Sequence, residues 1–415
     1  MTAVEFHDRT PIENAISSLT TTPDKIIFIG DGNAMGKFRP DYEEFLIRRD
    51  KNVELEYRPI KKDDINDIVR VLTEIAEQEK ECVFDLTGGE DLVLVAMGMV
   101  YQKYANSRDK SIKMQRLNVR SGVVRDCDND GKVICDYTPK LSVEENIKIN
   151  GGAIRFSQDG GTFLWDMSED FCSDINKMWE ICRKNPGKWN SQLNILEFIE
   201  KHISKASLKV SVDLFALKDQ TKRQGLKYTP IDSLLRGLAS QELISSLEID
   251  EYNASFVYKN EQVKKCLVKA GTVFELKMYL SAIRATDKNG APSYSDYMNG
   301  VYIDWDGKIP PENQDAKDTE NEIDILLMKG LMPIFVSCKN GSIDDDELYK
   351  LDSVTSRFGG KYAKKVLLAT YLGKGRKSMD SFRRRAKDMK ITLIEDIHKM
   401  NDAQINKIIR NLINL

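Results

Sequence analysis

Two acidic residues and one lysine stand at the ends of two apolar segments in the stretch NEIDILLMKGLMPIFVSCKNG, residues 321–341. Glu322 and Asp324 lie where the first segment begins, and Lys339 closes the second. Charges at the ends of buried strands are costly unless they are paired, solvated or bound to a ligand. Carboxylates can hold Mg²⁺ or Mn²⁺, and an ammonium can stabilise the charge that develops on a phosphate. The pattern fits metal-assisted phosphodiester hydrolysis, and a surface ion pair between Asp324 and Lys339 is the alternative.

The elements that must position these residues are two strands of a hairpin. Side chains alternate along a strand, so Glu322 and Asp324 share one face, as do Ser337 and Lys339. The turn KGLMP brings Asp324 into the neighbourhood of Lys339. Helical and strand-like segments surround the hairpin, beginning with a helix TVFELKMYLSAI, which predicts an α/β domain over 269–415.

A basic segment follows the hairpin. From residue 361 to 390 there are eleven lysines and arginines against two aspartates, a local charge of +9 in a chain of net charge −3. A phosphate backbone is a natural partner for such a segment. The alternative is a solvated helix face, balanced by the acidic residues 344–348. The residues expected to contact nucleic acid are Arg383, Arg384, Arg385, Lys374, Arg376 and Lys377.

Residues 1–150 alternate strand-like and helix-like segments, which predicts a parallel sheet with helices on its faces. Two glycine turns, IGDGNAMG and DLTGGED, follow predicted strands. Ligands of open α/β sheets bind at such strand ends, and backbone N–H groups there suit phosphate. Neither stretch is a Walker loop or a dinucleotide fingerprint, so an ordinary structural turn is the alternative.

The middle of the chain, 151–268, is mostly helical and ends in two strand-like pieces. A winged-helix-like connector and a plain helical linker both fit this pattern. We therefore predict three domains, 1–150, 151–268 and 269–415. The three histidines are scattered and the seven cysteines form no regular framework, which argues against a zinc site, a histidine-dependent triad and disulfides. With no apolar run of membrane length and no signal-peptide pattern, we expect a cytoplasmic protein without a membrane partner.

The C-terminal residues resemble the PD-(D/E)xK nuclease core found in CRISPR-associated effector nucleases. The resemblance rests on NEIDILL…PIFVSCKNG and on the preceding helix. It implies that Asp324 binds the metal, that Lys339 is the motif lysine and that Glu275 is the helical glutamate. The sequence departs from the family where an acid is expected two residues before the lysine, because Ser337 stands there. Glu322 or Glu275 would then supply the missing carboxylate.

The N-terminal residues resemble the CRISPR-associated Rossmann fold (CARF) domain, on the basis of DLTGG before an apolar helix and of the stretch PKLSVEENIKINGG. The resemblance implies a homodimer that binds a cyclic oligoadenylate, most simply cyclic tetra-adenylate, across its axis. Asn33 would read an adenine edge, and Thr87 a phosphate or ribose. The residues implied to line the ring site are Gly30, Asp31, Gly32, Asn33, Thr87, Gly88, Gly89 and Glu90.

Together these features lead us to expect a homodimeric, metal-dependent endonuclease of type III CRISPR antiviral defence that cuts DNA, single-stranded RNA or both. A cyclic oligoadenylate would activate it, and the connector would pass the motion of the sensor to the nuclease. The alternative is a ligand-controlled DNA-binding regulator with a winged helix and an inactive nuclease domain. A further possibility, on which no residue bears, is that the sensor cuts its own ligand.

Overall fold

A computed structural model describes residues 1–8, 10–49, 52–136, 140–157, 161–204, 207–307, 320–373 and 376–414. The side chains of residues 16–19, 38, 320, 376 and 377 lie outside this description. The fold is mixed α/β, as expected, and its described strands form three sheets. No helix in the described ranges is long and apolar enough to cross a membrane.

The first sheet has the strand order β3-β2-β1-β4-β5-β6-β7. The first five strands in this order, β3-β2-β1-β4-β5, run parallel, and β6 and β7 add an antiparallel ribbon. The chain adds β2 and β3 on one side of β1, and β4 and β5 on the other, so its topological switch point lies between β1 and β4. The strands are β1 (Thr2–Phe6), β2 (Lys25–Gly30), β3 (Glu54–Pro59), β4 (Glu81–Asp85), β5 (Ser111–Asn118), β6 (Val123–Asp126) and β7 (Val133–Cys135).

Helices cover both faces of the first sheet, as the alternation in the sequence predicted. Ile26 and Phe28 point toward α1 (Pro11–Thr21) and α2 (Gly32–Arg49), while Ile27 and Ile29 point toward the other face. That second face carries α3 (Ile65–Gln78) and α4 (Asp91–Tyr104). The sheet is thus buried on both sides, which suits parallel strands.

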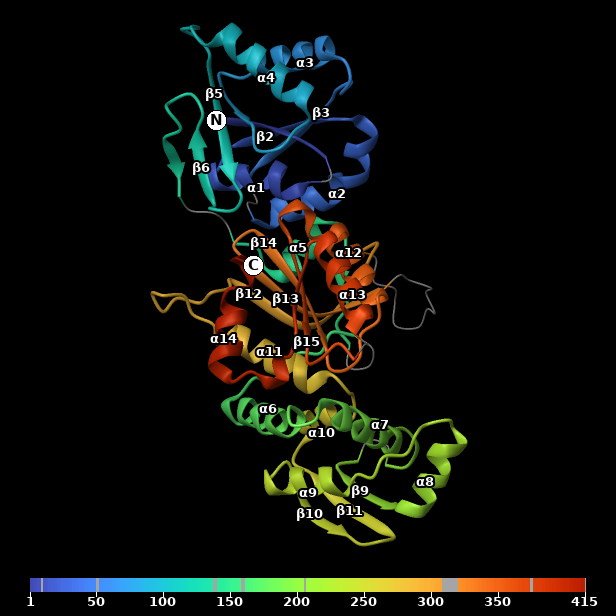
Figure 1. Ribbon diagram of the computed structural model, residues 1–415. Coiled ribbons are helices and arrows are strands. Elements are labelled where there is room, and N and C mark those ends of the chain that lie inside the picture. Colours follow the sequence, from blue (N-terminus) through green and yellow to red (C-terminus); the bar gives the residue numbers. More distant parts are fainter. Residues whose placement is uncertain are drawn as a thin grey trace.

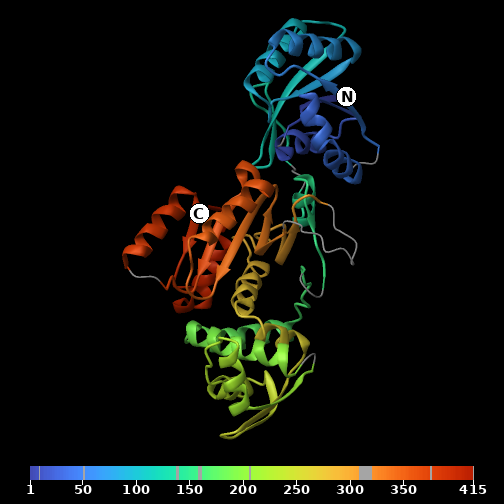
Figure 2. The same ribbon diagram turned by 90° about the vertical axis from the view of Figure 1, so that its right-hand side faces the viewer.

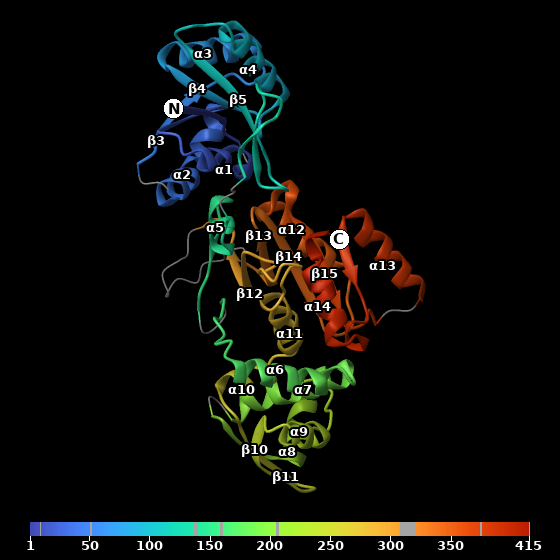
Figure 3. The same cartoon turned by 90° about the vertical axis from the view of Figure 1, so that its left-hand side faces the viewer.

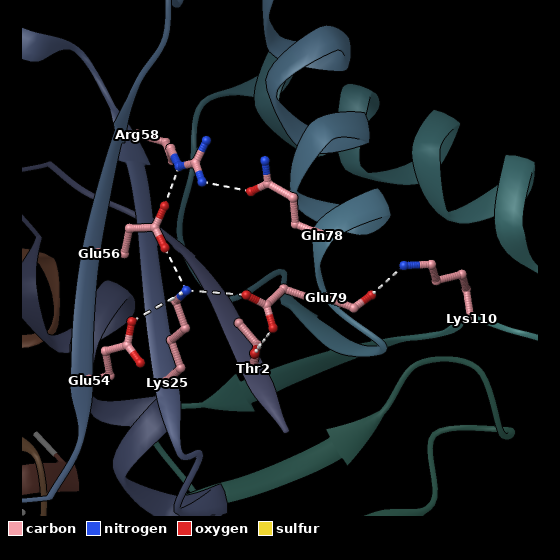
Figure 4. Close-up of polar contacts among 8 residues, drawn as sticks. All are labelled: Thr2, Lys25, Glu54, Glu56, Arg58, Gln78, Glu79 and Lys110. Atoms are coloured by element: carbon pink, nitrogen blue, oxygen red, sulfur yellow. Dashed lines mark hydrogen bonds and ion pairs between the residues drawn. The ribbon is translucent and has the colours of Figure 1, made fainter.

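The amino ends of these strands carry a polar cluster, which we call the Lys25 cluster (Figure 4). The Lys25 ammonium lies 2.6 Å from Glu56, 3.2 Å from Glu79 and 3.4 Å from Glu54. The hydrogen bond to Glu56 is the main reason why the pKa of Lys25 is raised. Burial works to raise the pKa of Glu56, but its contacts with Lys25 and Arg58 outweigh burial and lower it.

The middle of the chain forms a helical unit with a small antiparallel sheet of order β10-β11-β9. Helices combined with a β-ribbon match the expected composition of this region. Its elements are α6 (Glu169–Cys182), α7 (Pro186–His202), β9 (Lys209–Asp213), α8 (Leu214–Arg223), α9 (Asp232–Ser240), β10 (Ile244–Ile249), β11 (Asn253–Tyr258) and α10 (Glu261–Leu267).

The third sheet has the order β16-β15-β14-β13-β12-β8, and β13 and β14 form the predicted antiparallel hairpin. Its strands are β8 (Ala153–Ile154), β12 (Asp296–Asp304), β13 (Glu320–Lys329), β14 (Met332–Lys339), β15 (Lys364–Ala369) and β16 (Ile391–Ile394). Helices α11 (Thr272–Ile283) and α14 (Asp402–Arg410) pack into one core cluster with it. Helices α5 (Val143–Ile149), α12 (Asp346–Phe358) and α13 (Arg376–Asp388) share the other. Single 3₁₀ turns are η1 (Gly360–Tyr362), η2 (Ile397–Lys399) and η3 (Leu412–Asn414).

The order of the three parts in space differs from their order in the sequence (Figure 1). The third sheet lies in the middle of an elongated molecule, between the first sheet and the helical unit, and the two views turned by 90° agree (Figures 2 and 3). Strand β8 and helix α5 join the third sheet, although they precede the helical unit in the chain. The helical unit therefore does not lie between the first sheet and the third sheet, as a connector that relays motion would.

Candidate functional site

Asp324 is a buried carboxylate on β13. Its Oδ2 atom accepts a hydrogen bond from the backbone N–H of Cys338 (2.6 Å) and one from the hydroxyl of Ser337 (3.1 Å). Burial raises the pKa of Asp324, and the nearby Lys339 charge and these two hydrogen bonds oppose that rise. The hairpin therefore holds one oxygen of Asp324 in place.

Lys339, at the end of β14, forms an ion pair with Glu347 in the first turn of α12 (2.8 Å). Burial works to lower the pKa of Lys339, but the carboxylates of Asp324 and Glu347 outweigh it and raise the pKa. The partner of Lys339 is thus Glu347, and the expected alternative of an ion pair with Asp324 does not describe the contact. Sequence reasoning missed Glu347, although it belongs to the acidic run that directly follows β14.

Glu275 lies in the first turn of α11, after Gly271 at φ +99°. A Cβ atom on Gly271 would lie 3.0 Å from the Glu275 carboxyl oxygen, so glycine gives this carboxyl its space. Burial raises the pKa of Glu275 well above its usual range, and the charge of Asp324 is the next cause. The charge of Asp324 therefore acts on Glu275, and a shared site for the two carboxyls stays a prediction.

Glu322 is held at the rim of this site. One carboxyl oxygen lies 3.0 Å from the Lys269 ammonium, and the other accepts a hydrogen bond from the Tyr302 hydroxyl (2.9 Å). Glu322 borders two hollows, one of about 260 Å³ that also contains Asp324, Lys339 and Glu347, and one of about 170 Å³ that contains Glu275. Glu322 would have to leave both partners to bind a metal with both of its oxygens.

The donor set fits one hard divalent ion only in part. Asp324 and Glu275 are carboxyls whose charges repel, and a cation between them would relieve that repulsion. Among the described residues, however, no group of three histidine, cysteine, aspartate or glutamate side chains is arranged to hold a metal ion. Ser337 donates to Asp324 where the family pattern has an acid, so a third carboxylate is not assembled.

The first glycine stretch of the N-terminal region is a helix start rather than a turn. Helix α2 begins at Gly32, two residues after the last residue of β2. The Asp31 carboxylate accepts hydrogen bonds from the N–H groups of Asn33 and Ala34, both at 3.0 Å, and so caps this helix. Asn33 is exposed at the carboxyl edge of the sheet, while Gly30 is buried against the His7 carbonyl.

The second glycine stretch is packed against α1. A Cβ atom on Gly88 would lie 1.8 Å from the Asn14 side-chain oxygen, so packing against α1 requires glycine at this position. Thr87 accepts a hydrogen bond from the N–H of Leu117 (2.7 Å), which leaves its hydroxyl hydrogen for a ligand. Gly89 has φ +120°, and Glu90 is exposed and lies 3.1 Å from the Lys62 ammonium.

Residues at the end of β1 join this edge and were not predicted, because the strand TAVEF was missed. His7 is buried against Tyr42, and burial lowers its pKa to about 4. Neither ring nitrogen has a hydrogen-bond partner among the described residues. Asn14 and Glu13 of α1 reach Gly88 from the same side. The sequence signal that could have identified Asn14 and Glu13 is their position on the first helix after a buried strand.

The basic segment carries carboxylate partners. Arg383 makes two hydrogen bonds of 2.7 Å to Glu395, and Arg385 lies 2.6 Å from Asp345, within the acidic run named as the alternative. Arg384 donates to the Asp380 carbonyl. Lys374 and the side chains of Arg376 and Lys377 lie outside the described residues.

Comparisons with known proteins concern the fold of the whole chain. No protein-family model matches the sequence, and no curated protein matches it. Among solved structures, protein VC1899 from Vibrio cholerae aligns with a TM-score of 0.72 and 18% identity, over 100% of this chain and 97% of that one. Can2 from Sulfobacillus thermosulfidooxidans, in complex with cyclic tetra-adenylate, aligns with a TM-score of 0.66 and 16% identity, over the same shares. The chain therefore has the fold of VC1899 and Can2 from end to end.

Proposed function

We propose that the protein is a metal-dependent endonuclease of type III CRISPR defence, activated by a cyclic oligoadenylate. The observation that carries the proposal is the buried Asp324 carboxylate, held by Ser337 and Cys338 beside Glu275 and Lys339. A buried acid of raised pKa next to a second acid and a lysine is typical of a functional site. The fold shared with Can2, a protein in complex with cyclic tetra-adenylate, supports the choice of activator.

Each residue has a role in this proposal. Asp324 and Glu275 would hold the divalent ion, Mn²⁺ or Mg²⁺, with Glu322 recruited from the rim. The ion, when bound, polarises the phosphate and lowers the pKa of a water. Lys339 would leave Glu347 and lie against the scissile phosphate, where its ammonium stabilises negative charge. Ser337 and the Cys338 N–H would keep Asp324 oriented.

The ring would bind at the carboxyl edge of the first sheet, near the switch point between β1 and β4. Asn33, the Thr87 hydroxyl and the exposed start of α4 face that edge of the sheet. An approximately two-fold symmetric ring matches a two-fold axis, so one ring would serve a homodimer. Leu92, Val95 and Met99 of α4 are exposed at helical spacing and would suit a second copy of the chain.

The test is cleavage of plasmid DNA and of single-stranded RNA with Mn²⁺, with and without cyclic tetra-adenylate. We expect ring-dependent cleavage that Asp324→Asn reduces by about 100-fold or more, as expected when a metal ligand is lost. Calorimetry should give one ring per two chains for both proteins, because Asp324 is remote from the first sheet. Cleavage that survives in Asp324→Asn, or that never requires the ring, would contradict the proposal.

A second candidate is a ligand-controlled DNA-binding regulator. Two observations favour it: the third carboxylate is not assembled at the site, and the helical unit combines helices with a three-stranded sheet. The same experiment separates the two functions. A ring-dependent, sequence-specific shift of DNA without cleavage would support the regulator.

A further inference from the structure

We propose that a basic cleft at the amino edge of the third sheet binds the phosphodiester backbone of nucleic acid. The cleft has a volume of about 1190 Å³ and lies between the start of β15, the start of β16, helix α13 and the β13–β14 turn. Arg120, from the β5–β6 turn of the first sheet, also borders it. We call this hollow the basic cleft, and it is separate from the hollows around Asp324 and Glu275.

The charge of the basic cleft is strongly one-sided. Of the described residues that line it, eight are lysine or arginine and one, Glu395, is acidic. Three of the cations have carboxylate partners: Lys361 pairs with Glu13, Lys365 with Asp352 and Arg383 with Glu395. The other five form no ion pair with a described residue: Arg120, Lys329, Lys364, Lys387 and Lys390.

These five cations lie around one hollow and repel each other, and a polyanion relieves that repulsion. They come from four separate segments of the chain, so they do not form the solvated face of one helix. A single phosphate cannot reach cations spread over so wide a cleft, whereas a nucleic-acid strand brings one phosphate per nucleotide. The charge arrangement therefore fits a backbone better than a small anion.

The lining also indicates how nucleic acid would be contacted. Tyr362 is the one aromatic residue among the described lining residues, and its hydroxyl already donates to Glu13 (2.8 Å). One aromatic ring offers little stacking surface for successive bases, so contacts would be made mainly to phosphates and would depend little on sequence. Binding should instead depend strongly on salt.

The strand register places the basic cleft at the opposite end of β14 from the candidate site. Lys329 pairs with Met332 at the cleft end, while Ile325 pairs with Val336 near Asp324. Eight residues of β14 span about 26 Å at about 3.3 Å each. A duplex rises ~3.4 Å per base pair, so about eight base pairs would reach from one end to the other. The inference rests on the proposed nuclease function for the identity of the polyanion. The basic cleft would be a second binding site for the substrate, remote from the site of cleavage.

The test measures binding without cleavage. Fluorescence anisotropy in EDTA would follow a duplex DNA and a single-stranded RNA of about 24 nucleotides each, at salt concentrations from about 50 to 200 mM. The triple variant Lys329→Gln, Lys364→Gln, Lys390→Gln should bind about 100-fold more weakly at ~0.1 M salt. Its log–log salt slope should be shallower by about 2.7 for duplex and about 2 for the single strand.

A matched control removes three exposed lysines elsewhere, by Lys103→Gln, Lys288→Gln and Lys407→Gln. This control should keep the wild-type slope for both ligands. If the triple variant does not fold, the exposed pair Lys387→Glu and Lys390→Glu makes the same test.

A slope that is unchanged in the cleft variant, or reduced equally in the control, overturns the inference. Loss of binding to one ligand alone supports it and assigns that nucleic acid to the cleft. Because no metal is present, this result does not depend on cleavage. A protein that binds nucleic acid normally in EDTA but never cleaves it would count against the nuclease proposal. The basic cleft would still be a nucleic-acid-binding site in that case.

Discussion

At the scale of single residues, Ser337 occupies the position where the nuclease pattern has an acid, and it contacts Asp324 instead of adding a carboxylate. Its hydroxyl donates to Oδ2 of Asp324, and so does the N–H of Cys338. Both hydrogen bonds from described residues use the same oxygen, which leaves Oδ1 for a cation. Ser337 is thus suited to orient Asp324, the proposed metal ligand, rather than to be a ligand itself.

Ser337→Glu tests whether this position faces the metal. A second carboxylate beside the buried Asp324 should destabilise the metal-free protein by about 1–3 kcal/mol, because two like charges share a site with little water. Mn²⁺ should bind more tightly than to the wild type, and saturating Mn²⁺ should restore much of the lost stability, since a ligand that binds the folded state stabilises it. Calorimetry gives the affinity, and melting in EDTA and in Mn²⁺ gives the stability.

Ser337→Ala is the matched control, because it removes the hydroxyl without adding charge. It should lose the hydrogen bond to Asp324 and gain no Mn²⁺ affinity. Equal Mn²⁺ titrations for Ser337→Glu and the wild type would mean that position 337 does not contribute to a metal site.

At the scale of elements, the Lys25 cluster ties the amino ends of β2 and β3 to the segment before β4 (Figure 4). Three glutamates would lie close together there without the ammonium of Lys25. The cluster therefore allows parallel strands with acidic ends to pair in register.

Lys25→Met should lower the stability at neutral pH by about 1–3 kcal/mol, because hydrogen bonds to a charged group are lost. The folded pKa of Glu56 lies below its unfolded value. Its contribution is therefore present above the unfolded pKa, about 4.3, and is lost as the pH falls through the folded value. The difference between Lys25→Met and the wild type should shrink on acidification below about pH 4.

Calorimetric melting from acid to neutral pH measures this dependence. Lys80→Met, at an exposed lysine of the same domain, provides the comparison and should change stability little. If the destabilisation of Lys25→Met were the same at pH 7 and at pH 3.5, the ion pairs would not be its cause.

At the scale of the whole molecule, helix α1, which covers the first sheet, contacts the turn η1 beside the third sheet. Glu13 of α1 is buried, pairs with Lys361 and accepts a hydrogen bond from the Tyr362 hydroxyl. Its Cβ lies 3.1 Å from the position that a Cβ on Gly88 would take, so it also touches the loop proposed to bind the ring. Tyr362 follows α12 within a few residues, and the first turn of α12 carries Glu347. Helix α12 thus lies between the contact with Glu13 and the partner of Lys339.

Glu13→Gln should therefore weaken activation more than ring binding. The amide keeps an acceptor for Tyr362 but loses the charge that holds Lys361. We expect ring-stimulated cleavage to fall by about 10-fold, equivalent to about 1.4 kcal/mol of coupling, while the dissociation constant of the ring changes less than about two-fold.

Calorimetry and cleavage assays on the same preparation separate these two effects. Glu144→Gln, on the exposed side of α5, serves as a charge-matched control. Equal losses of ring binding and cleavage would indicate damage to the ring site. No loss in either would mean that ring binding and cleavage are coupled through residues other than Glu13.

The sequence alone determined the features that depend on local pattern. The alternation of apolar segments predicted the α/β class, the β13–β14 hairpin and α11, because burial on one face or both repeats along a strand or helix. The spacing along the hairpin predicted Asp324 and Lys339 as neighbours, whereas Glu275 was implied only by the resemblance to the nuclease core, and the pKa of Glu275 responds to the charge of Asp324. The role of that group stays a prediction.

Tertiary structure decided what depends on residues distant in the chain. The pairing of Lys339 with Glu347, the packing of Gly88 on Asn14 and the central position of β1 are contacts between segments, which no local period encodes. The same holds for the basic cleft, because the five cations that form no ion pair with a described residue come from four segments and became a group only when the sheet edge brought them together. Spatial order also differed from chain order, since β8 pairs with β12 and leaves the helical unit at the far end of the molecule.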